Sequence, residues 1–198
     1  MSSRKLQLSD ILDLRAYERE RESLRNSVIE VKRRRRVGLG SVVTVMFENR
    51  ETVKSQIQEM LRAEKVTTDA GVTEELNAYN PLIPESGQLC ATLFVELTTD
   101  EQMREWLPKL VGIEGSIVIK LSDGSDVRSI TEEGHAENLT RADITAAVHY
   151  VRFELNAAQV EAFASGVVKV VCDHPEYLQS VELPAFVVTE LLSDLRPS

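Results

Sequence analysis

Residues 47–60 read FENRETVKSQIQEM and carry the chain from a strand directly into a helix. The residues just before, VVTVMF at 42–47, are apolar or β-branched, which is typical of a buried strand. Asn49 stands where a helix N-cap is expected, because its side-chain oxygen can accept a hydrogen bond from a backbone N–H of the first turn. An apolar stripe then recurs at helical spacing: Val53, Ile57, Met60 and Leu61. The stretch therefore predicts a strand followed by a helix that buries one face.

The rest of the chain continues as strands and helices without regular alternation. Strands are predicted at 89–97, 117–121, 127–130, 148–155, 167–173 and 178–183, with a hairpin turn at Asp123-Gly124. Helices are predicted at 10–35, 68–79, 98–106, 156–166 and 184–195, and a short one from Thr140. This order favours an α+β fold, with a mixed, largely antiparallel sheet packed by helices and a long basic N-terminal helix.

The net charge of -9 is distributed unevenly along the chain. Residues 1–36 hold 11 Lys and Arg against 6 Asp and Glu, a balance of +5, whereas the remainder holds 12 against 26, a balance of -14. We therefore expect an N-terminal helical arm (1–36) and a single α+β domain (37–198). If the arm docks on the acidic part of a second copy, the protein is a homodimer whose stability falls with salt. Tyr17, Leu24, Val28 and Val31 would supply apolar contact; the alternative is an arm folded back on its own domain.

Composition excludes several classes of protein. Cys90 and Cys172 are far apart and form no CxxC motif, so neither a zinc ribbon nor a thioredoxin-like site is indicated. No apolar stretch approaches about 18 residues, and the first residues are charged, which predicts a cytoplasmic, soluble protein without a membrane partner. The basic run Lys32–Arg36 lacks interleaved aromatic residues, so a nucleic-acid partner is not expected.

The start of the predicted helix is the first candidate ligand site. Unpaired backbone N–H groups at Asn49 and the guanidinium of Arg50 suit an anion. Glu48 precedes the cap, and Gln56 and Glu59 lie on one flank of the helix beside its apolar stripe. The alternative is an amphipathic helix whose polar side chains are solvated.

The histidines are the second candidate. Alternation along 148–155 places His149 on one face with Val151, Phe153 and Leu155, and Tyr150, Arg152 and Glu154 on the other. Cys172 and His174 share a direction near the end of a later strand. Two strand histidines, His149 and His174, with a carboxylate such as Glu48 or Glu59 would make a 2-His-1-carboxylate metal site. The alternative is a hydrogen-bonded core histidine.

Six segments together resemble one bacterial family, the domain-of-unknown-function family 3501. They are FENRETVKSQIQEMLRAEK (47–65), NPLIP (80–84), ATLFVELT (91–98), REWLPKLVGIE (104–114), AVHYVRFEL (147–155) and VVCDHPEY (170–177). The resemblance extends from about Leu6 to Leu195. It implies a setting of oxidative stress or iron–sulfur electron transfer, and a redox protein as partner, but it transfers no catalytic residue and no cofactor.

The sequence thus predicts a non-catalytic accessory or ligand-binding protein, the alternative being a metal-dependent redox enzyme using His149 and His174. The predicted ligand site is where the helix start meets the His149 strand. Its residues are Glu48, Asn49, Arg50, Gln56, Glu59, His149 and Arg152.

Overall fold

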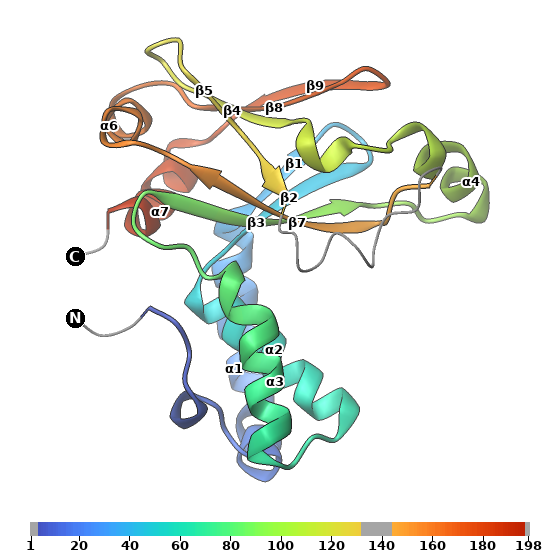
Figure 1. The fold of residues 1–198 in the computed structure, drawn as a ribbon, viewed down its shortest axis with the longest axis vertical. Helices are drawn as coiled ribbons and strands as arrows, with labels where there is room; N and C mark the ends of the chain where they lie inside the picture. The colour runs from blue at the N-terminus through green and yellow to red at the C-terminus, as the bar shows by residue number, and fades with distance from the viewer. Residues whose placement is uncertain (1–3, 132–143, 197–198) are drawn as a thin grey trace.

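The computed structural model describes residues 4–131 and 144–196, and the described strands form two antiparallel sheets (Figure 1). Sheet A has the strand order β1-β2-β3-β7-β6 and sheet B the order β5-β4-β8-β9. The strands of sheet A are β1 (Arg36–Leu39), β2 (Val43–Glu48), β3 (Gln88–Val95), β6 (Ile130–Thr131) and β7 (Val148–Glu154). Those of sheet B are β4 (Ile117–Lys120), β5 (Asp126–Arg128), β8 (Lys169–His174) and β9 (Tyr177–Glu182).

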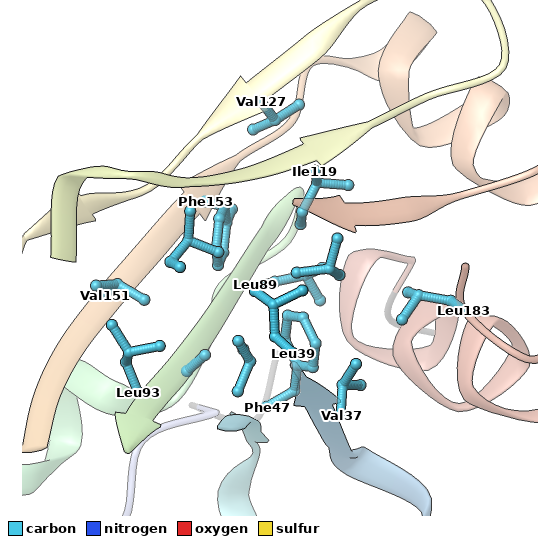
Figure 2. Close-up of a cluster of buried hydrophobic side chains, with 14 of the residues drawn as sticks. Val37, Leu39, Phe47, Leu89, Leu93, Ile119, Val127, Val151, Phe153 and Leu183 are labelled. Carbon is cyan, nitrogen blue, oxygen red and sulfur yellow. The ribbon is translucent and has the colours of Figure 1, made fainter. Parts of the chain in front are cut away.

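The two sheets face each other across the main hydrophobic core. Strand alternation sends Phe47, Leu93 and Phe153 from sheet A toward Ile119 and Val127 of sheet B (Figure 2). The rings of Phe47 and Phe153 are tilted by 43° to each other, with their centroids 6.2 Å apart. This side of sheet A is therefore the core face.

Helices cover the ends of the sandwich and the other side of sheet A. Helices α6 (Ala157–Ser165) and α7 (Ala185–Leu195) lie at one end of the sheets and α4 (Asp100–Lys109) at the other (Figure 1). Helices α1 (Leu14–Arg35), α2 (Arg50–Glu64) and α3 (Asp69–Tyr79) form a layer on the side of sheet A away from sheet B. The described residues also form three short 3-10 helices: η1 (Leu8–Asp10), η2 (Asn80–Leu82) and η3 (Ile113–Gly115).

A second apolar cluster joins this helical layer to the N-terminal segment. Its buried members are Leu6, Val53, Ile57, Leu61, Leu76, Leu82 and Ile83, with Tyr150 of sheet A packed against them. Sheet A is thus covered on both faces. This explains why β2 and β3 are buried along nearly their whole length instead of alternating.

The predicted α+β class with antiparallel pairing and a long N-terminal helix is confirmed, with three differences in detail. Helix α1 begins at Leu14 and not at residue 10, because Asp13 caps it by accepting from the Ala16 N–H. Strand β1, which directly follows α1, was not predicted. The strands form two sheets, whereas one was expected, because alternation gives the faces of a strand but not its neighbours.

No helix of the described residues has the length and apolar character needed to cross a bilayer. The helix predicted from Thr140 lies outside the described residues.

Candidate functional site

The outer face of sheet A carries a pocket of about 240 Å³ where the sheet meets the helical layer. We call it the sheet-A pocket. Its lining comes from outward-facing strand positions and from α1, α2, α3 and η2: Lys32, Arg36, Met46, Glu48, Thr52, Val53, Gln56, Tyr79, Leu82, Thr92, Phe94, Val148 and Tyr150. Polar and aromatic groups converge here in a mainly apolar space, which is typical of small-ligand sites.

Glu48, the last residue of β2, supplies the negative charge of the pocket. One carboxylate oxygen accepts from the Thr92 hydroxyl at 2.6 Å, and the other accepts from the Thr52 hydroxyl. Thr52 stands beside Glu48 because Asn49 caps α2, accepting the Thr52 N–H at 2.9 Å. The strand-to-helix junction predicted from the sequence therefore positions this carboxylate.

Two tyrosines form part of the apolar wall. Burial raises the pKa of Tyr150 to about 12, and the nearby Tyr79 and Glu48 add to the shift. Burial also raises the pKa of Tyr79, although a hydrogen bond with Gln56 opposes the shift. Both phenols therefore keep their protons at neutral pH.

Two cations line the pocket from the end of α1 and the start of β1. Arg36 pairs with Glu96, and its guanidinium lies 5.7 Å from the centre of the Phe94 ring. Lys32 is half-buried, in the last turn of α1. Its ammonium group forms no hydrogen bond or ion pair with the described residues.

A larger hollow, of about 360 Å³, lies between the N-terminal segment and helices α2 and α3. Aliphatic side chains such as Leu8, Ile11 and Val72 dominate its lining. It offers fewer convergent polar groups than the sheet-A pocket, which is therefore the better candidate.

Of the predicted ligand residues, the structure brings Glu48 and Gln56 into the pocket. Asn49 acts as the helix cap, and Arg50 pairs with Asp10 at 2.7 Å. Arg152 is on the outer face of β7, as predicted, and contacts Glu154 at 3.0 Å. Neither arginine lines the pocket.

Glu59 is engaged between two helices. It accepts from the Tyr17 hydroxyl at 2.7 Å and from two guanidinium nitrogens of Arg21 at 2.8 and 2.9 Å. These contacts lock α1 to α2.

His149 lies on the core face of sheet A, opposite the face that α2 covers. Its Nε2 contacts the Thr145 hydroxyl and the Ala146 carbonyl, both at 2.9 Å, and burial lowers the pKa of the imidazole. Glu114 is 3.8 Å from its Nδ1. The expected meeting of Glu59 with His149 is therefore not found, because sheet A separates them.

His174 makes two hydrogen bonds within the protein. Its Nε2 donates to the Val111 carbonyl at 3.0 Å, and its Nδ1 accepts from the Glu176 N–H at 3.3 Å. Within residues 4–131 and 144–196, no group of three or more His, Cys, Asp or Glu side chains is placed to hold a metal ion. The two histidines predicted as ligands are not brought together with a carboxylate such as Glu48 or Glu59.

The basic arm contacts its own chain. Arg34 and Arg35 pair with Glu190 of α7, and Arg33 pairs with Glu30. Tyr17 and Val31 are buried within the chain, whereas Leu24 and Val28 line a shallow hollow against α2. The homodimer stays a prediction.

The sequence reasoning missed several residues of the pocket, among them Lys32, Thr92, Tyr79 and Tyr150. One signal was available: residues 42–47 and 89–95, within two predicted strands, place apolar or hydroxyl side chains on both faces, which indicates a sheet covered on both faces. Tyr150 lies on the face of β7 opposite His149. A prediction that helices cover that face would therefore have identified Tyr150 as a buried, pocket-lining residue.

Comparison with known proteins gives a family and a solved fold. The family model described as "Protein of unknown function (DUF3501)" matches residues 5–195. A crystal structure of a protein of unknown function from Burkholderia pseudomallei K96243 is 36% identical and superposes with a TM-score of 0.89. The match covers 97% of this chain and 100% of that one. No curated protein matches the sequence.

Proposed function

This chain belongs to DUF3501, a family of proteins of unknown function, and we propose that it is a non-catalytic accessory protein that binds a small ligand in the sheet-A pocket. The observation that carries the proposal is the convergence of Glu48, Lys32, Gln56 and two tyrosines on one concave space. These side chains come from α1, α2, α3, β2 and β7, so the fold brings together segments far apart in sequence.

The size of the pocket supports a ligand of modest size. Its volume of about 240 Å³ lies just below the range of roughly 300–1,000 Å³ that is usual for drug-sized ligands. Met46, Val53 and Leu82 give the pocket apolar surface, and all three are almost fully buried. Such a site favours a molecule with a short apolar part and a few polar groups.

The chemistry of the lining supports binding over catalysis. A general acid or base works best with a pKa near the operating pH. The raised pKa of Tyr150, about 12, keeps its phenol protonated at neutral pH, so the group is a poor general acid and is not available as a base. Both oxygens of Glu48 already accept hydrogen bonds from threonine hydroxyls. These groups suit recognition of a ligand by hydrogen bonds and charge.

The metal-dependent redox alternative gains no support from the described residues. His149 and His174 are both hydrogen-bonded within the protein, and neither belongs to a group of three or more potential metal ligands in the described part of the chain. We therefore favour the binding protein.

A fragment collection screened by ligand-observed NMR tests the proposal. We expect binders whose signal is lost in Val148→Trp, since Val148 lines the pocket and an indole there would fill it. Leu178→Trp is the matched control: Leu178 is 68% exposed on β9 of sheet B, so its replacement leaves the pocket open. A screen without binders, or binders that Val148→Trp retains, would contradict the proposed function.

A further inference from the structure

The sheet-A pocket contains one negative and one positive side chain that form no ion pair with any residue of 4–131 or 144–196. Glu48 accepts from Thr92 and Thr52, and hydroxyl donors satisfy lone pairs without supplying positive charge. Lys32 lines the same pocket from α1. Among the described residues, neither side chain forms an ion pair, whereas Arg36 beside them is paired with Glu96.

The fold fixes the carboxylate of Glu48 and favours a positive charge at Lys32. Glu48 is fixed by two hydrogen bonds, and its carboxylate retains lone pairs for another donor. Lys32 is in the last turn of α1, where the helix dipole favours a cation. A half-buried charge without a partner is unfavourable, so a ligand that neutralises both charges gains more than one that neutralises neither.

The surface between the two charges is largely aromatic and aliphatic. Tyr79, Phe94 and Tyr150 line it together with Val148. Aromatic faces attract ammonium groups as well as hydrocarbon, so this surface suits a short chain that ends in a cation.

We propose that the ligand is a small zwitterion of the amino-acid class, with its ammonium group at Glu48 and its carboxylate at Lys32. This inference rests on the proposed function, and it adds the class of ligand and the orientation. Each end of the molecule forms a charge-assisted hydrogen bond, and its carbon chain contacts the tyrosines.

Isothermal titration calorimetry on the full chain tests this inference with matched probes. Glycine, 4-aminobutyrate and 5-aminopentanoate carry both charges at increasing separation, whereas pentanoate and pentylamine each carry one. We expect at least one zwitterion to bind about tenfold or more tightly than either single-charge compound, because hydrogen bonds to charged groups add that much affinity. Equal or tighter binding of pentanoate or pentylamine would overturn the proposal.

Two substitutions test the orientation. Glu48→Gln should weaken binding of the zwitterion by about tenfold or more. It should abolish any binding of pentylamine and leave that of pentanoate unchanged. Lys32→Met should weaken binding of the zwitterion to a similar extent. It should also abolish any binding of pentanoate while sparing that of pentylamine. This reciprocal pattern separates a role in recognition from a loss of folding, which would affect all three probes alike. Unchanged zwitterion binding in both variants contradicts the inference.

Glu182→Gln and Lys169→Met are matched controls, because both side chains are exposed on sheet B away from the pocket. Both should bind as the wild type does. If no zwitterion binds, but fragments bind the wild type and not the Val148→Trp variant, the proposed ligand class is wrong and the binding function stands. If the fragment screen also gives no binder, the function itself fails.

Discussion

Arg35 is the most buried charged residue of the described chain, with 1% of its surface exposed. Its guanidinium donates to Asp194 at 2.6 Å and to Glu190 at 3.0 Å. Burial raises the pKa of Asp194, although the adjacent Arg35 opposes that shift. The guanidinium at the end of α1 thus offsets part of the cost of removing this carboxylate from water.

We predict that Arg35→Met destabilises the protein by about 3–5 kcal/mol, since it leaves Asp194 buried without its cation. Arg34→Met is the matched control: Arg34 pairs with the same Glu190 at 3.2 Å, but its side chain is 51% exposed. The control should cost less than about 1 kcal/mol. Urea unfolding followed by circular dichroism measures both values, and similar losses in the two variants would contradict the role of burial.

At the residue scale, sequence reasoning placed side chains correctly on a strand but not across the molecule. Alternation assigned His149 and Tyr150 to opposite faces of β7, as observed. Which face meets α2 depends on how sheets and helices pack, and no local pattern encodes that. The predicted site was therefore centred on His149, whereas the pocket opens beside Tyr150.

The contact between helices α1 and α2 is the clearest link between two elements. Hydrogen bonds from Arg21 and Tyr17 lower the pKa of Glu59 to about 2, with burial opposing them. Burial and the Glu59 hydrogen bond in turn raise the pKa of Tyr17 to about 12. The three side chains thus make the packing of α1 on α2 dependent on pH.

The sign of this dependence follows from the direction of the Glu59 shift. A carboxylate whose pKa is lowered by folding adds stability above its usual pKa of 4.5, and this stability is lost as the pH falls toward 2. We predict that Glu59→Gln lowers the melting temperature above pH 4.5, and that its difference from the wild type shrinks as the pH falls toward 2. Thermal unfolding across this range measures it. Glu64→Gln, at an exposed position at the end of the same helix, should show a much smaller effect; a pH-independent difference for Glu59→Gln would refute the coupling.

Elements with strong local signals were predicted well. Asn49 and Asn156 cap helices α2 and α6, and the hairpin around Asp123-Gly124 joins β4 to β5. Strand β1 was missed because it is four residues long and follows α1 without a break. Its pairing with β2 is a short hairpin in which Leu39 faces Val43, whereas the hydrogen bond from the Tyr177 hydroxyl to the Leu39 carbonyl is a long-range contact that local sequence does not reveal.

In the whole molecule, basic residues of the N-terminal segment form ion pairs with acidic residues of the same chain. Ion pairs join the basic residues 1–36 to the acidic remainder, as in Arg21 with Glu59, Arg35 with Asp194 and Arg36 with Glu96. Apolar contacts reinforce them: Leu6, Ile11 and Leu14 pack in the second cluster with Ile57 and Leu61. The N-terminal arm therefore covers a hydrophobic surface that would otherwise face water.

We predict that a chain beginning at residue 37 does not fold cooperatively. Exposing a buried aliphatic side chain costs about 1.5–3 kcal/mol, and the loss of the arm uncovers several of them on α2, while total domain stability is typically about 5–15 kcal/mol. The loss of Arg35 adds the unpaired Asp194 to this cost. Near-ultraviolet circular dichroism and thermal unfolding of the truncated chain measure the outcome, with Arg34→Met in the full chain as a control that should unfold normally. A truncated chain that melts cooperatively close to the full-length temperature would show that the arm is dispensable, and that residues 37–198 hold their core without the contacts described above.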